Sequence, residues 1–295
     1  MPFLKHFGLK DYPFGLTPNT GLYYPSAEME AILTALCFSL SRGDGLIKVV
    51  GEVGTGKTLL ARLLLERLKK KSVEVAYFPV PYAIAPRDIP ERIVYEFGIK
   101  LKKSENPAEA LNRFLLTQHA AGRRIILVID EAQSLGREGL EAVRLLTNLE
   151  TKTDKLLQII LFGQPELDML LATPDMRQFL QRVVFSYRLV ALDRATVARY
   201  LGYRLNLCRY KARKSTKEKL RPNETACGVR FHPSAARRIA SVSAGLPRLV
   251  HVLADKALMA CYVDGAQDVA LRHVRKACLE TEGVAWHWRF FCRFM

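Results

Sequence analysis

Five short runs of apolar and β-branched residues mark the N-terminal part of the chain. They lie at 46–50, 73–79, 125–129, 157–162 and 183–189. Each has the length of a strand. The run Ile125–Ile129 is apolar throughout, as is typical of a strand buried on both faces of a sheet. The pattern therefore predicts five strands.

Segments with helical periodicity separate these runs. They span 59–70, 89–97, 107–121 and 137–149. Strands that alternate with helices form βαβ units, in which right-handed crossovers make the strands parallel. We therefore expect an α/β fold with a five-stranded parallel sheet flanked by helices.

The strand pattern ends near residue 190, and helix start signals follow. Each signal is a capping Asp or a proline in the first turn. The predicted helices span 193–207, 232–244, 247–262 and 268–283. The sequence thus predicts an α/β nucleotide-binding domain over 1–190 and an all-helical domain over 191–284. The helical domain contains a basic loop at 211–228, and an aromatic tail follows at 285–295.

The first predicted strand leads into the phosphate-binding pattern G-x-x-x-x-G-K-T. Its residues are Gly51, Glu52, Val53, Gly54, Thr55, Gly56, Lys57 and Thr58, and Leu59 continues into the next predicted helix. The glycines let backbone N–H groups curl around phosphates, and the helix N-terminus adds partial positive charge. We expect Lys57 to reach the outer phosphates and the Thr58 hydroxyl to hold Mg²⁺. The pattern predicts ATP and Mg²⁺ as cofactors.

Polar residues end two later strands. Asp130 and Glu131 follow the most apolar strand, and Gln164 ends the strand expected beside it. The carboxyl end of a parallel strand faces the ligand crevice. We expect Asp130 to hold the magnesium shell and Glu131 to polarise the attacking water. Gln164 is a candidate for contact with that water or with the γ-phosphate, so the site predicts an ATPase.

Arginines complete the candidate site, because a guanidinium can neutralise the charge on a transferring phosphoryl group. Arg182 precedes the fifth strand, and Arg248 opens a predicted helix of the second domain. We expect Arg182 to act on the nucleotide of a neighbouring subunit and Arg248 on its own. Arg177 and Arg188 lie near the same strand and stay alternatives to Arg182.

These motifs resemble those of the AAA+ ATPases, and within them the secretion and pilus-biogenesis ATPases of the general-secretion-pathway A type. The resemblance is carried by residues 7–9, 13–18, 51–58, 130–133, 163–167 and 245–248. Residues 47–54 and 76–79 are similar to the short members that serve mannose-sensitive haemagglutinin type IV pili. The resemblance implies a helical lid, a ring-like homo-oligomer, and sensor, trans-acting and lid roles for Gln164, Arg182 and Arg248.

The resemblance also implies a task. Longer members continue into a membrane span and a cell-wall-binding domain, whereas this sequence ends at Met295. We expect this difference to argue against the membrane-anchored secretion role. The task that the resemblance implies is assembly of a type IV pilus or secretion apparatus, with its assembly proteins as partners. An ATP-dependent, DNA-binding regulator of transposition is the alternative, followed by an ATP-binding scaffold with little turnover.

The charge of the chain, +16 at pH 7, favours a polyanionic partner. Eight Lys or Arg residues and one Glu lie within 204–221. This stretch is a candidate contact for DNA or an anionic membrane surface, or else a solvated loop. The aromatic tail suits a membrane interface, a partner subunit or packing onto its own domain.

Features that would indicate export or membrane insertion are missing from the sequence. The six cysteines form no C-x-x-C pair, no apolar run approaches the ~18–20 residues of a membrane helix, and no secretion signal is recognisable. We expect a cytoplasmic protein, with peripheral attachment to the inner membrane left open.

Overall fold

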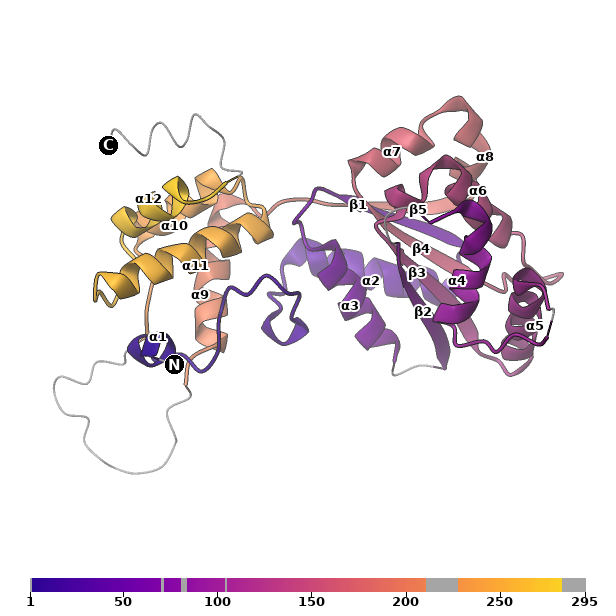
Figure 1. The fold of residues 1–295 in the computed structure, drawn as a ribbon, viewed down its shortest axis with the longest axis horizontal. Coiled ribbons are helices and arrows are strands. Elements are labelled where there is room, and N and C mark those ends of the chain that lie inside the picture. The colour runs from indigo at the N-terminus through magenta and orange to yellow at the C-terminus, as the bar shows by residue number, and fades with distance from the viewer. Residues whose placement is uncertain (1, 70–71, 81–83, 104, 211–227, 283–295) are drawn as a thin grey trace, which may run out of the picture. The chain divides into compact units, whose positions relative to one another are not determined.

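The computed structural model describes residues 2–69, 72–80, 84–103, 105–210 and 228–282 (Figure 1). The chain divides into two compact units. The α/β unit is Ala27–Val190, and the helical unit combines Met1–Ser26 with Ala191–Met295. No helix among the described residues is long and apolar enough to cross a membrane.

One five-stranded sheet forms the centre of the α/β unit. Its strands are β1 (Leu46–Gly51), β2 (Val73–Pro79), β3 (Arg124–Asp130), β4 (Gln158–Gly163) and β5 (Val183–Leu189). Their order is β2-β3-β4-β1-β5, and every neighbouring pair is parallel. The predicted parallel sheet is confirmed. The order brings the carboxyl ends of β3, β4 and β1 side by side.

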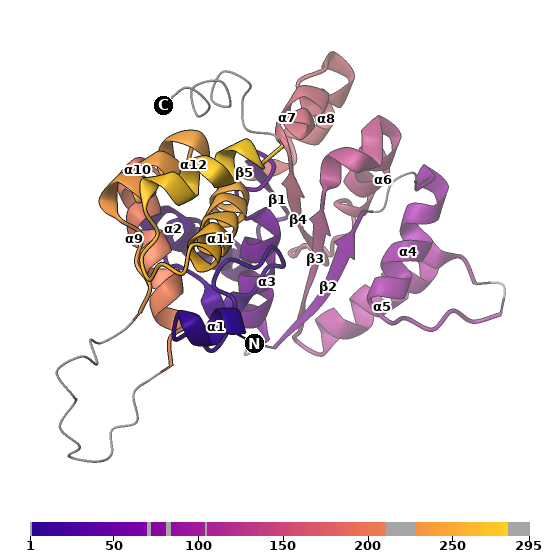
Figure 2. The same cartoon turned by 60° about the vertical axis from the view of Figure 1, so that its left-hand side comes forward.

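Helices cover both faces of this sheet. α2 (Ala27–Arg42) and α3 (Lys57–Leu68) lie on one face, and α4 (Ile89–Glu96), α5 (Pro107–Ala120) and α6 (Gly136–Leu146) lie on the other (Figure 2). The shorter α7 (Pro165–Leu171) and α8 (Arg177–Leu180) follow β4. Because both faces are covered, the residues of β1, β4 and nearly all of β3 are buried.

The helical unit contains α9 (Arg194–Leu207), α10 (Pro233–Val242), α11 (Pro247–Val263) and α12 (Leu271–Leu279). Asp193 caps α9 as expected, since its side chain accepts a hydrogen bond from Thr196 N at 2.7 Å. Asp268 does not cap the last helix. Its carboxylate accepts a bond from Arg230 N at 3.0 Å, and α12 begins at Leu271.

The first 26 residues also belong to the helical unit, although the sequence analysis assigned them to the α/β domain. This segment contains α1 (Pro2–His6) and the 3₁₀ turn η1 (Thr20–Leu22). Its apolar side chains enter the core of the helical unit, among them Phe3, Phe7, Leu9, Phe14 and Leu22. The segment therefore buries its apolar surface against α9–α12.

The buried side chain of Arg204 in α9 binds the backbone of this segment. Its guanidinium donates to the carbonyl oxygens of Pro13 at 2.7 Å and Leu22 at 2.8 Å. Only 3% of the residue is exposed. Arg204 is therefore not available to a polyanion, in contrast to its place in the predicted basic stretch. Most of that stretch, 211–221, and the tail 285–295 lie outside the described residues.

Candidate nucleotide-binding site

The loop after β1 has the backbone that phosphate binding requires. β1 ends at Gly51 and α3 begins at Lys57. Gly54 and Gly56 adopt φ angles of 83° and 104°, which side chains rarely allow. At Gly51 a Cβ would lie 2.7 Å from the Leu189 carbonyl oxygen of β5. Larger residues at these positions would change the shape of the loop.

Lys57 lies folded across the loop. Its Nζ donates to the carbonyl oxygens of Gly51 at 2.7 Å and Glu52 at 3.1 Å. Burial lowers the pKa of Lys57, and the carboxylates of Glu131 and Asp130 oppose that shift. The ammonium thus has carbonyl partners that phosphate oxygens can replace.

Asp130, the last residue of β3, accepts hydrogen bonds from three donors. Its Oδ2 accepts from Thr58 Oγ1 at 3.0 Å and from the Tyr77 hydroxyl at 2.7 Å, and its Oδ1 accepts from Glu131 N at 3.0 Å. Burial and the bond to Asp130 raise the pKa of Tyr77. Sequence reasoning missed Tyr77, whose contact follows from the pairing of β2 with β3.

The donor set at Asp130 fits Mg²⁺. Hydroxyl and carboxylate oxygens are the ligands that this hard cation prefers. Among the described residues no group of three His, Cys, Asp or Glu could enclose a metal. The Thr58 hydroxyl and the Asp130 carboxylate fit a magnesium ion, which is usually bound by one or two carboxylates together with phosphates and water.

Glu131 is held by two amides. Its Oε2 accepts from Gln133 Nε2 at 2.6 Å and from Gln164 Nε2 at 2.8 Å. Gln133 Oε1 in turn accepts from the backbone N–H of Gln164 at 3.0 Å. Glu131 itself adopts φ 56° and ψ 42°, a left-handed conformation that costs about 1–2 kcal/mol. This network explains how the strained backbone is retained.

Lys57, Glu131 and Gln164, three of the predicted catalytic residues, thus come together at one edge of the sheet. Gln164 precedes α7 and its side chain binds Glu131, and Lys57 and Thr58 are the first residues of α3. Sequence reasoning missed the part played by Gln133. The sequence offered one signal for Gln133, which is its position two residues after Glu131. The structure places Gln133 on the 3₁₀ turn η3 (Ala132–Leu135).

The arginines are not part of this cluster. Arg182 lies just before β5, whose first residue pairs with Leu46 at the start of β1, so it is at the opposite edge of the sheet. Arg182 is exposed, and its Nη2 donates to Asn148 Oδ1 at 2.9 Å. Arg188 instead binds Asp168 at 2.7 Å.

Arg177 is exposed and has no side-chain partner among the described residues. Arg248 lies exposed in the first turn of α11 in the helical unit, and its role stays a prediction.

The fold and this loop define the class of protein. Residues 40–171 match the AAA domain family. The strand order, the loop after β1 and the acidic pair after β3 are those of an AAA+ P-loop NTPase fold. The chain is related to general secretion pathway protein A of Aeromonas hydrophila, with 34% identity over 285 residues. The match covers 96% of this chain and 49% of the relative, so the chain spans about half the relative's length.

Solved structures share the fold at lower identity. The ORC2 protein of Aeropyrum pernix, in ADPNP–ADP complexes, is 19% identical with a TM-score of 0.64, over 93% of this chain and 73% of that one. CDC6P of Pyrobaculum aerophilum is 18% identical with a TM-score of 0.67, over 90% and 70%. The RuvB branch migration motor of Thermotoga maritima is 15% identical with a TM-score of 0.58, over 90% and 72%.

Proposed function

We propose that this protein binds Mg·ATP and hydrolyses it. The observation that carries the proposal is the convergence of Lys57, Thr58, Asp130, Glu131 and Gln164 at the carboxyl edge of three adjacent strands. A site for binding alone needs the loop and the metal ligands. The strained, hydrogen-bonded Glu131 beside them supplies a base as well.

Each side chain has a distinct role in this mechanism. Backbone N–H groups of 52–57 and the ammonium of Lys57 bind the phosphates. Thr58 and Asp130 would hold Mg²⁺, which would supply neutralising charge to the phosphates. Glu131 accepts a hydrogen bond from the attacking water through an oxygen atom not already held by an amide. Gln164 orients Glu131 and lies ready to contact that water.

We further propose that the protein acts as a homo-oligomer. Arg182 lies on the edge of the sheet opposite its own phosphate loop, so it serves a nucleotide only in a neighbouring subunit. Side-by-side packing with the same contact repeated would make a ring. Arg188 is the weaker alternative, because Asp168 already engages its guanidinium.

The relative described above supports a proposal for the biological setting. Its name is general secretion pathway protein A, and the match covers nearly all of this chain. We propose a cytoplasmic component, at the inner-membrane side, that helps assemble a type IV pilus or a secretion apparatus. Pilus and secretion assembly proteins are then the partners that ATP turnover acts on.

The proposed role of Glu131 as the base is tested with Glu131→Gln. Glutamine keeps the shape of the Glu131 side chain but lacks the basic carboxylate. Nucleotide affinity should therefore persist, while the rate of phosphate release falls by at least ~10²-fold. Glu138→Gln is the matched control, since Glu138 is exposed on α6. Unchanged turnover in Glu131→Gln would reject the proposed base.

The trans role is tested by mixing two inactive variants. Arg182→Ala keeps an intact loop, and Lys57→Ala keeps an intact arginine. An arginine supplied in trans is typically worth ~10³–10⁵ in rate, so mixed oligomers should regain part of the activity. No recovery, with mixed oligomers verified by light scattering, would reject Arg182 in this role.

A further inference from the structure

The described residues of the helical unit surround an apolar groove. It is a cavity of about 520 Å³ along α9 and the start of α10. Leu201, Leu205, Val229 and Phe231 line its floor. It involves none of the residues assigned above to nucleotide binding. A cavity of this size accommodates a few side chains of another molecule.

Gly202 is an unusual residue in the lining of the groove. It lies in the interior of α9, is exposed, and lines the cavity. A Cβ added there would meet nothing within 4 Å. Glycine in a helix interior is unfavourable relative to alanine, and packing among the described residues gives no reason for it. The glycine leaves this part of the groove lining without a side chain.

Three arginines surround the floor: Arg209, Arg230 and Arg237. Arg230 has one distant acidic partner, Asp268, at 3.8 Å. Arg209 donates from Nη2 to the Val229 carbonyl at 3.1 Å, and its buried Nε has no partner among the described residues.

Arg237 is exposed and forms no ion pair within the described ranges. The groove is therefore apolar in its floor and positively charged at its rim.

We propose that this groove binds an acidic, amphipathic segment of a partner protein. Apolar side chains of the segment fill the floor, and its Asp or Glu residues pair with the arginines at the rim. Nucleic acid fits less well, because a phosphate backbone gains nothing from an apolar floor. The proposal does not depend on ATP turnover.

The chain's own remaining segments do not match the groove in charge. Residues 211–227 contain six Lys or Arg and two Glu, and residues 283–295 contain two Arg and no acid. Both are basic in sequence, so their charge does not complement that of the arginine rim. Charge complementarity thus favours a separate, acidic partner.

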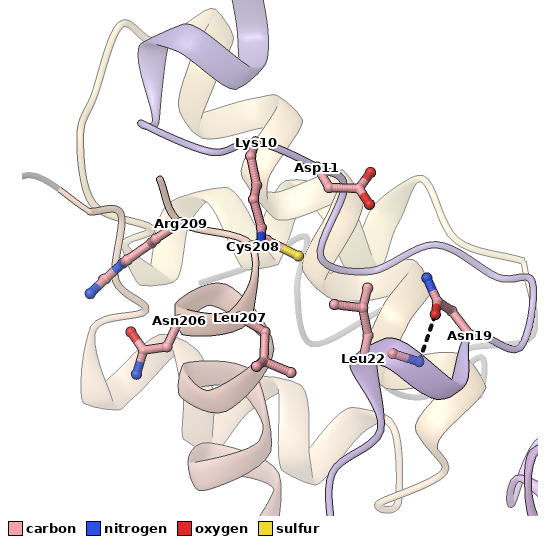
Figure 3. A pocket seen from close by; sticks show the side chains of 9 residues that line it. Lys10, Asp11, Asn19, Leu22, Asn206, Leu207, Cys208 and Arg209 are labelled. Carbon is pink, nitrogen blue, oxygen red and sulfur yellow. Dashed lines mark hydrogen bonds between the residues drawn. The ribbon is translucent and has the colours of Figure 1, made fainter. Parts of the chain in front are cut away.

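A second cavity lies next to the α9–α10 groove. It has a volume of about 370 Å³ and shares Asn206 and Arg209 with the groove. Figure 3 shows Lys10 and Asp11 of the N-terminal segment across from the last turn of α9. The carboxylate of Asp11 makes this second cavity less suited to an acidic ligand, so we assign the segment to the α9–α10 groove alone.

The test uses a displayed random-peptide library selected on the intact protein. Selected peptides should combine Asp or Glu with Leu, Ile or Phe, and their binding should weaken as salt rises. Gly202→Trp fills the groove and Arg237→Glu reverses its charge. Each should weaken peptide binding by about tenfold or more in fluorescence polarisation.

Controls separate this groove from general effects. Arg194→Glu makes the same charge change at the start of α9, away from the lining, and should bind peptides as the wild type does. Gly202→Ala should raise the melting temperature, because alanine favours the helix. Circular dichroism verifies that each variant is folded.

The proposal is overturned if no peptide is enriched, if the enriched peptides lack acidic residues, or if they bind Gly202→Trp and Arg237→Glu as tightly as wild type. It is also overturned if these variants reduce binding only to duplex DNA or to vesicles of phosphatidylcholine and phosphatidylglycerol.

Discussion

Replacing Gln133 by alanine would remove one of the two amides that hold Glu131. Gln133 Nε2 lies 2.6 Å from Glu131 Oε2, and its Oε1 receives the backbone N–H of Gln164 at 3.0 Å. Gln164 still donates to Glu131 in the variant, at 2.8 Å in the wild type. Glu131 would therefore be held by one amide, and that amide would itself be less fixed.

The size of the effect follows from these bonds. A hydrogen bond to a charged group contributes about 1.5–3 kcal/mol. If this energy orients Glu131 in the transition state, its loss slows the reaction about ten- to hundredfold, at 1.36 kcal/mol for each factor of ten. Among the described residues, Gln133 makes no hydrogen bond to the loop 51–58, so nucleotide affinity should not change.

The assay compares steady-state phosphate release with the affinity for a fluorescent ATP analogue. Gln178→Ala is the matched control, because Gln178 is an exposed glutamine on α8. Gln133→Ala and Gln164→Ala should not be additive when combined, since both amides hold one oxygen. Turnover of Gln133→Ala at or above the wild-type rate would refute the orienting role.

Three further outcomes follow from local geometry. Lys57→Ala should lose tight ATP binding in equilibrium titration, because a buried cation then no longer neutralises the phosphates; wild-type affinity would contradict the loop assignment. Gly245→Ala should destabilise the protein by about 2–4 kcal/mol in chemical denaturation, since φ is 76° and a Cβ would lie 1.8 Å from the Leu192 carbonyl oxygen. Burial and the charge of Arg204 lower the pKa of His251 from 6.5 to about 4. As the pH falls from 6.5 to about 4, the unfolded chain binds a proton at His251 before the folded chain does, so the folded state loses stability over this pH range. His251→Gln should reduce that fall in melting temperature, and an unchanged pH dependence would count against this reasoning.

The sequence alone predicted the α/β fold and most residues of its candidate site. Strand runs, helix periodicity and the loop 51–58 are local patterns, so they could be recognised without knowing what each element packs against. The acidic pair was located by the strand that it ends. Local signals failed where a side chain binds a distant residue, as Asp268 does with Arg230 instead of capping the last helix.

Only the tertiary structure decided the contacts made across elements. The order β2-β3-β4-β1-β5 brings Tyr77 to Asp130 and Gln164 to Glu131, and no spacing in the sequence encodes that order. Residues 1–26 have no strong periodicity, and their apolar side chains acquire a core only when α9–α12 supply it. Arg204 belongs to a basic stretch in the sequence, yet it is buried because the carbonyl groups of Pro13 and Leu22, far away in the chain, satisfy its guanidinium.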